Sequence, residues 1–408
     1  MKATKATLAR SEFPARAGTE TARYASRTAS RYAEPVTIIG AGPAGLACAI
    51  VLARGGRRVV VREWHNRVGS RFHGDFQGIE NWSDNRDVLT ELRAAGIETG
   101  FEHHGVSEVT AFDDRGRRFD VRSGRPLYYL VRRGEGDGTL DTALLHQAIA
   151  SGAKIRLGDR ADRADGRVVL AGGPRVADAI AVGYVFDTDM PDGCWLALNS
   201  DLAPPGYAYL LTQGGRGTVA SCMFAGFKRQ AEHVERTVGF FRVKAGLAMR
   251  NPRPFSGFAN FRLPGSAMQG GHPVVGEQAG FQDALAGFGM RYAIRSGVLA
   301  AHSILEGTDY TSLWRRELMP LLRVGVVNRF AFNAAGRWGH RLVIRRLAGG
   351  DAGATLHRLY TPSLLSRVLF PLAHLRYRAP LHDRSCDHVG CDCVWCRCRS
   401  GLAVPAMS

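Results

Sequence analysis

A short apolar run, a glycine-rich turn and a helical pattern follow one another near the N-terminus. Residues 36–39, Val-Thr-Ile-Ile, have the length and β-branched character of a buried strand. Pro43 suits the first position of a helix, where its missing N–H costs no hydrogen bond. The apolar residues beyond it recur at helical spacing until Gly55 and Gly56, which end the helix. A second strand over Arg58 to Val61 completes a predicted β-α-β unit.

The turn of this unit has the spacing Gly40-x-Gly42-x-x-Gly45. The first glycine allows the tight turn, the second lets a pyrophosphate approach the backbone, and the third lets the helix pack closely on the sheet. The helix N-terminus offers N–H groups and a partial positive charge to phosphates. Glu63 lies 18 residues after Gly45, about where a carboxylate binds ribose hydroxyls. The predicted nucleotide-binding residues are therefore Gly40, Ala41, Gly42, Pro43, Ala44, Gly45 and Glu63.

Later segments alternate between strand and helix patterns. Residues 101–132 and 190–262 alternate apolar and polar positions between Gly and Pro turns, which predicts an antiparallel sheet in a second domain. Residues 290–306 place apolar side chains on one helical face, and Gly307 ends that helix. Gly287 and Gly289 precede it, and we expect them to present open N–H groups that stabilise negative charge.

Composition and charge add a basic flank to this picture. The chain has 408 residues, enough for two or more domains, and a net charge of +17. Residues 1–33 contribute +5 and are expected to form a disordered basic tail, with a transit peptide as the alternative. Residues 309–384 contribute +9, which predicts amphipathic helices that cover the body or lie on an anionic membrane surface. No nucleic-acid-binding motif accompanies this charge, so no nucleic acid partner is expected.

Cysteine is concentrated at the C-terminus. Only three cysteines precede residue 380, which indicates that the protein is found in a reducing cytoplasm. The basic residues 309–384 add the expectation of peripheral membrane contact. No run approaches the ~18 apolar residues needed to cross a bilayer. Cys393-x-x-Cys396 has the spacing of a metal site or a redox pair, and an unligated reduced tail is the third interpretation. The five cysteines of this tail are Cys386, Cys391, Cys393, Cys396 and Cys398.

The glycine turn, Glu63 and the following Gly69-Ser70-Arg71 together resemble FAD-dependent oxidoreductases of the para-hydroxybenzoate hydroxylase type. The resemblance implies that the turn and Glu63 hold the ADP half of FAD, and that the segment ending at Arg71 passes the pyrophosphate. Gly276-Glu277 resembles the Gly-Asp segment that binds the ribityl chain of FAD in these proteins, with Glu in place of Asp. The resemblance thereby adds five expected cofactor-binding residues: Arg71, Gly276, Glu277, Gly287 and Gly289.

Over residues 34–308 the pattern most resembles the geranylgeranyl reductase family, and residues 207–211 partly match its Tyr-x-Trp-x-Phe-Pro segment. This resemblance implies hydride transfer from reduced FAD to a prenyl double bond, with NADPH or NADH as the possible reductant. His73, Tyr207 and Tyr209 are the candidate proton donors. An FAD-dependent monooxygenase of an apolar or aromatic substrate is the alternative. A non-catalytic flavin or metal redox-sensing protein that uses the cysteine tail is an alternative of another class.

The expected fold class is α/β: a Rossmann-like FAD-binding domain with a mostly parallel sheet, an inserted antiparallel-sheet substrate domain and a C-terminal helical region. The expected parts are a basic tail over 1–33, a discontinuous FAD-binding domain over 34–100, 133–185 and 265–308, a substrate domain over 101–132 and 186–264, a basic helical region over 309–384 and a Cys-rich tail over 385–408.

Overall fold

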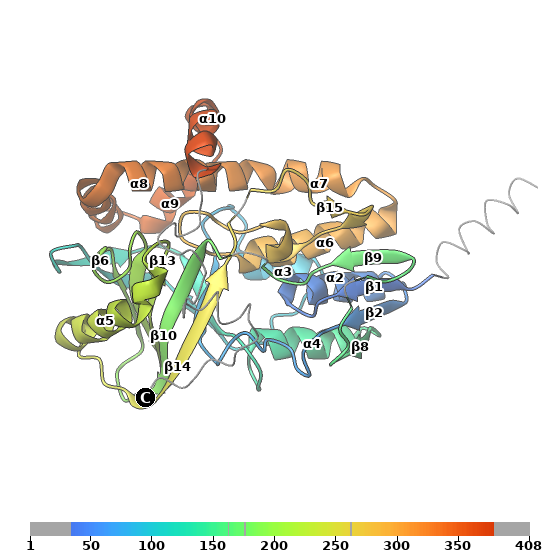
Figure 1. The fold of residues 1–408 in the computed structure, drawn as a ribbon, viewed down its shortest axis with the longest axis horizontal. Helices are drawn as coiled ribbons and strands as arrows, with labels where there is room; N and C mark the ends of the chain where they lie inside the picture. The colour runs from blue at the N-terminus through green and yellow to red at the C-terminus, as the bar shows by residue number, and fades with distance from the viewer. Residues whose placement is uncertain (1–33, 162, 175–176, 262, 379–408) are drawn as a thin grey trace, which may run out of the picture.

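The computed structural model describes residues 34–378 except 162, 175–176 and 262 (Figure 1). The expectations for residues 1–33 and for the cysteine tail therefore lie outside the described residues. The predicted β-α-β unit is confirmed, with β1 (Val36–Ile39), α2 (Pro43–Arg54) and β2 (Val59–Arg62). Strands β8 (Lys154–Arg156) and β9 (Arg167–Leu170) extend it to a parallel sheet of order β8-β2-β1-β9.

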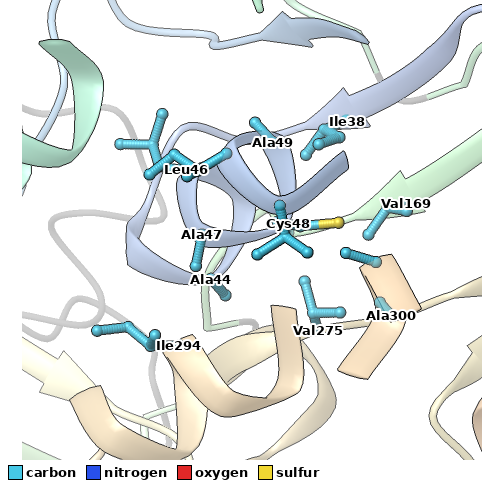
Figure 2. Close-up of a cluster of buried hydrophobic side chains, with 14 of the residues drawn as sticks. Ile38, Ala44, Leu46, Ala47, Cys48, Ala49, Val169, Val275, Ile294 and Ala300 are labelled. Carbon is cyan, nitrogen blue, oxygen red and sulfur yellow. The ribbon is translucent and has the colours of Figure 1, made fainter. Parts of the chain in front are cut away.

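Helix α2 lies at the centre of the first domain. Its residues Ala44 to Leu52 are all buried, because the helix packs between the parallel sheet and α6 (Met290–Glu306). Figure 2 shows Ala44, Ala47 and Cys48 of α2 facing Ile294 and Ala300 of α6. A Cβ on Gly297 of α6 would lie 2.1 Å from the carbonyl oxygen of Ala44, so the two helix backbones are in direct contact. The predicted end of α6 at Gly307 is confirmed.

A three-stranded antiparallel sheet and two further helices flank this layer. The sheet has the order β3-β7-β4, from Phe76–Glu80, Tyr128–Arg132 and His103–Val106. Helix α3 spans Val88–Ala94, and α4 spans Leu140–Ala150 behind its N-cap Thr139, whose side chain accepts from the N–H of Thr142. Arg291 and Arg295 of α6 both bind Glu91 of α3, which fixes α6 against this side of the molecule.

A seven-stranded sheet forms the second layer, in the order β14-β10-β13-β12-β11-β5-β6. All neighbouring strands are antiparallel except β11 and β5, which run parallel. Helix α5 (Gln230–Ala245) packs its apolar residues on one face of this sheet. The strands are β5 (Glu108–Phe112), β6 (Arg118–Arg122), β10 (Ala179–Asp187), β11 (Gly193–Ala197), β12 (Tyr207–Gln213), β13 (Arg216–Met223) and β14 (Arg250–Ala259).

Four helices follow α6: α7 (Tyr310–Glu317), α8 (Met319–Ala348), α9 (Ala352–Tyr360) and α10 (Leu364–Arg378). Helix α8 is kinked at Gly336, whose φ of 55° and ψ of −159° are not helical. Figure 1 shows α8 along one side of the molecule and α10 on its outer side, away from the sheets. None of the helices in the described part of the chain has the length and apolar character needed to cross a bilayer.

Short elements complete the chain between these parts. A hairpin of β15 (Met268–Gln269) and β16 (His272–Pro273) precedes the 3-10 helix η2 (Gly276–Ala279), and η1 (Phe227–Arg229) precedes α5. The predicted α/β architecture, with a parallel sheet, separate antiparallel strands and C-terminal helices, is confirmed.

The contact between α2 and α6 can be tested with a pair of glycine substitutions. We expect Gly297→Ala to lower the free energy of unfolding by about 1–3 kcal/mol, because its Cβ would overlap the Ala44 carbonyl. Gly239→Ala in α5 is the matched control: no atom lies within 4 Å of its ideal Cβ. The control should gain roughly 0.5–1 kcal/mol from helix propensity. Chemical denaturation measures both changes, and equal stabilisation of the two variants would contradict the close contact.

Candidate flavin and substrate site

The glycine turn has the geometry of a phosphate-binding loop. Gly40 has a φ of +109°, and a Cβ there would lie 2.3 Å from the carbonyl oxygen of Ala171. A Cβ on Gly45 would lie 2.1 Å from the carbonyl oxygen of Gly40, so both positions are restricted to glycine by backbone contact. Gly42 differs, because no atom lies within 4 Å of its ideal Cβ. It is the N-cap of α2 and has no side-chain cap, which leaves open space in front of the helix N-terminus.

Glu63 lies beside this turn, at the end of β2. Its Oε2 accepts the N–H of Ala41 at 2.8 Å, and its Oε1 accepts the N–H of His65 at 3.0 Å. These bonds hold the carboxylate at the rim of the turn, where the remaining lone pairs of its oxygens can accept hydrogen bonds from ribose hydroxyls. The structure therefore brings the predicted acid to the predicted turn.

The second predicted motif lies against the first. A Cβ on Gly276, which has a φ of +64°, would lie 2.8 Å from the Cβ of Ala44 in the first turn of α2. Glu277 forms an ion pair with Arg71 at 3.1 Å, although 206 residues separate them in the chain. Arg71 also donates to the carbonyl oxygen of Phe258 at 3.2 Å. The two segments that the resemblance assigned to FAD thus meet in one place.

The turn before α6 corrects one expectation. The N–H of Gly287 donates to the carbonyl oxygen of Asp283 at 3.1 Å, so the prediction that it is open is wrong. The turn closes on itself, because Asp283 also accepts the N–H groups of Leu285 and Ala286 through its side chain. Gly289 is the N-cap of α6, and both glycines line the cavity described next.

A cavity of about 990 Å³ connects these segments with the second layer of the molecule. One part is lined by the glycine turn, Glu63, Arg71 and the segment from Gly276 to Gly289. Another part is lined by apolar and aromatic side chains of the sheets and of α8 and α9. These include Trp82, Tyr128, Trp195, Leu198, Tyr207, Tyr209, Leu211, Phe332, Ile344, Leu347, Leu356, Leu359 and Tyr360. Its volume is at the upper end of the range for small-molecule sites.

Of the three candidate proton donors, the structure brings two to the cavity. His73 is exposed and is not among the residues that line it, although its neighbours Phe72 and Asp75 are, and its role as donor stays a prediction. Tyr207 and Tyr209 both line the cavity, with ring centroids 6.1 Å apart. The hydroxyl of Tyr207 donates to the carbonyl oxygen of Ala286 at 2.5 Å. The hydroxyl of Tyr209 forms no hydrogen bond with any described residue. Burial raises the pKa of both phenols well above the usual value, so both stay protonated.

Sequence reasoning missed a buried ion pair beside Gly69. Arg133 donates to both carboxylate oxygens of Asp141 at 2.8 and 2.9 Å, with side-chain exposures of 6% and 1%. A Cβ on Gly69 would lie 2.8 Å from the Cα of Gly134, so this pair supports the segment that carries Arg71. The position of Asp141 in the first turn of α4 gave no sign of its partner, which lies eight residues earlier in the chain.

Two further carboxylates near the cavity were also missed. Asp75 is buried and lines the cavity, and its oxygens accept the N–H of His73 and the amide of Gln77. Asp283 accepts the hydroxyl of Tyr360 at 2.8 Å. Burial raises the pKa of Asp283 to about 6, although the N–H of Ala286 and the Tyr360 hydroxyl oppose this shift. The partners of Asp75 lie only two residues away, but no local pattern could have found the contact of Asp283 with Tyr360, since 77 residues separate them.

The sheet arrangement and the two-part cavity define the fold of the flavin-dependent oxidoreductases. Residues 38–81 match a family of NAD(P)-binding Rossmann-like domains. The chain is 25% identical over 325 residues to the menaquinone reductase of Mycolicibacterium smegmatis. The aligned region covers 68% of this chain and 78% of that protein. Residue-level similarity thus extends well beyond the nucleotide-binding segment.

Solved structures share the architecture at lower sequence identity. A geranylgeranyl bacteriochlorophyll reductase-like protein from Thermoplasma acidophilum has a TM-score of 0.58 at 17% identity, over 85% of this chain and 97% of that one. A flavin-dependent brominase has a TM-score of 0.59 at 15% identity, over 84% of this chain and 98% of that one. These likenesses establish the fold and do not separate reductases from halogenases.

The described residues fit FAD. The open space at Gly42 can take a pyrophosphate, Glu63 can accept ribose hydroxyls, and Glu277 is positioned by Arg71 beside the first turn of α2. When bound, FAD supplies two-electron transfer, and the protein contributes binding, orientation and exclusion of water.

The open space at Gly42 generates a prediction. We expect Gly42→Ala to fold with an unchanged melting temperature, because its Cβ meets no protein atom and its φ of −77° suits alanine. The same Cβ would occupy the space of the pyrophosphate, so flavin retained after gel filtration should fall by roughly tenfold or more. Gly100→Ala, whose Cβ also meets nothing within 4 Å, is the matched control. Full flavin retention by Gly42→Ala would place the cofactor elsewhere.

Proposed function

We propose that this protein is an FAD-dependent oxidoreductase that reduces a double bond in the isoprenoid chain of a lipid, with NADPH or NADH as the reductant. The observation that carries the proposal is the continuity of the cavity, which joins the nucleotide-binding segments to a large apolar volume. The similarity to a menaquinone reductase over two thirds of the chain supports it, because a menaquinone carries an isoprenoid side chain.

The distribution of charge along the cavity supports an apolar substrate. Its charged lining residues come from the parallel sheet and its loops, from the segments around Arg71 and Glu277, from the Arg133–Asp141 ion pair, and from Arg329 of α8. Arg329 donates to the carbonyl oxygens of Leu285 and Pro205 and lies over the ring of Phe224. The remaining walls are aromatic and aliphatic, which suits an extended hydrocarbon chain and excludes water from it.

Reduction of an alkene needs a proton as well as a hydride, and we propose Tyr209 as its source. Tyr209 lines the cavity, and the buried carboxylate of Asp75, which also lines it, is among the groups that raise its pKa. Its hydroxyl carries a proton at all physiological pH values and is not committed to another described residue. Tyr207 is less suited, because its hydroxyl is bound to Ala286.

Monooxygenation or halogenation of an apolar or aromatic substrate is the second candidate. The flavin-dependent brominase supports this candidate, because its TM-score of 0.59 is as high as the 0.58 of the reductase-like protein. A redox-sensing role of the cysteine tail stays a prediction, since that tail lies outside the described residues.

An anaerobic half-reaction assay separates these functions. The purified protein should bind FAD, and NADPH or NADH should bleach its visible spectrum. Adding a geranylgeranyl lipid that carries no quinone, without oxygen, should then restore the oxidised spectrum, with a product two hydrogens heavier by mass spectrometry. Oxidation that requires oxygen and yields a hydroxylated product would support the monooxygenase instead. A protein that binds no flavin would overturn both.

The role of Tyr209 can be tested in the same assay. We expect Tyr209→Phe to bind FAD normally but to slow alkene-dependent reoxidation on the order of 10²-fold, the usual range for loss of a general acid. Tyr207→Phe is the matched control and should lose much less. The reduction of FAD by NADPH or NADH should be unchanged in both variants. Equal rates for the two variants would exclude Tyr209 as the donor.

A further inference from the structure

Helix α10 has two different faces. Its inner face, with Leu369, Phe370 and Ala373, packs against Val326, Val327 and Phe330 of α8. Its other apolar side chains are exposed, with exposed fractions from 51% for Leu372 to 78% for Leu364. Figure 1 shows that α10 lies on the outer side of α8, where no other described element covers it. The exposed set, here called the α10 outer face, consists of Leu364, Leu365, Val368, Leu372 and Leu375.

Positive charge surrounds this face. Residues 319–378, which form α8 to α10, contain ten Arg and a single acid, Asp351. Asp351 is the N-cap of α9, where it accepts the N–H groups of Ala354 and Gly124. Arg367 and Arg376 are exposed on α10 itself. An exposed apolar stripe with exposed arginines on the same helix is complementary to an anionic lipid surface.

The cavity opens at the end of α9, the helix that precedes α10 in the chain. Leu359, near the end of α9, lines the cavity and is also 42% exposed, so the cavity reaches the surface there. The side chain of Asn328 in α8 donates to the carbonyl oxygen of Leu359 at 3.1 Å and holds this end of α9 in place. Leu364 follows five residues later, at the first turn of α10.

We propose that the α10 outer face lies on the surface of an anionic bilayer, so that an apolar substrate enters the cavity beside Leu359 directly from the lipid. The binding part of this proposal is independent of the reaction, and the entry part rests on the proposed function. A second copy of the chain fits less well, because symmetric contact would bring two arginine-rich faces together. The 15 residues of α10 can lie in the interface plane, with the leucines inserted and the arginines at the headgroups.

Vesicle co-sedimentation of the full-length protein, without substrate, tests the contact. The protein should bind vesicles of phosphatidylcholine with phosphatidylglycerol, and binding should fall steeply in high salt or on pure phosphatidylcholine. Arg367→Gln with Arg376→Gln should weaken binding by about fivefold per arginine, or roughly 25-fold together. Val368→Ser with Leu372→Ser should weaken it by at least ~10-fold. Val243→Ser on α5, which is 82% exposed, and Arg118→Gln on β6 are the matched controls.

The outcomes separate this proposal from the proposed function. Loss of binding in both pairs of variants, with flavin content and melting temperature retained, supports the docking face whatever the reaction is. Binding that is unchanged in both pairs, or lost equally in the controls, overturns it. Dimers in analytical ultracentrifugation that the serine variants dissociate would assign the face to a second copy and also overturn it. If entry from lipid is correct, the same variants should slow turnover of vesicle-borne substrate while sparing a detergent-dispersed one.

Discussion

The close contact between α2 and α6 is the constraint on which the site depends. Gly297 allows the backbone of α6 to touch the carbonyl of Ala44, and any side chain there would separate the two helices. Because the glycine turn precedes α2 and the Gly276–Gly289 segment precedes α6, this contact sets the distance between the two halves of the flavin site. The ion pair between Arg71 and Glu277 then joins the same two regions at their rim. A packing requirement inside the core thus determines the geometry of the cofactor cradle.

The cavity divides its chemistry between the layers of the fold. Most charged groups lie on the first layer of the molecule, where the glycine turn, the N-terminus of α2 and carboxylates suit a nucleotide. The seven-stranded sheet and the C-terminal helices contribute aromatic and aliphatic walls. Tyr209 on β12 lines the cavity as well. In the proposed reaction it donates a proton to a substrate on the second layer, while the first layer binds the proposed FAD. The arrangement is typical of folds in which a nucleotide-binding unit is combined with a separate substrate layer.

The accuracy of the sequence-based predictions follows from the range of the interactions involved. The β-α-β unit and the end of α6 at Gly307 depend on neighbours a few residues away, and both are where the sequence predicts them. The prediction that the N–H of Gly287 is open is wrong because it depends on the conformation of a turn. Within that turn, this N–H donates to the carbonyl oxygen of Asp283. The position of His73 and the pairing of Asp283 with Tyr360 depend on elements far apart in the chain. Periodicity carries no information about such contacts, so they could be found from coordinates alone.

The distance along the chain between Ala44 and Gly297 has a consequence for biosynthesis. The nucleotide-binding unit leaves the ribosome early, but its partner helix is synthesised some 250 residues later. Until then the side of α2 that packs against α6 is exposed, and only one of the two segments proposed to bind FAD has been synthesised. Binding of the proposed FAD therefore has to wait for synthesis of α6, and until then the exposed side of α2 is a surface for chaperones to shield. With the proposed site, bound flavin in a newly made molecule would report that α6 has packed against α2.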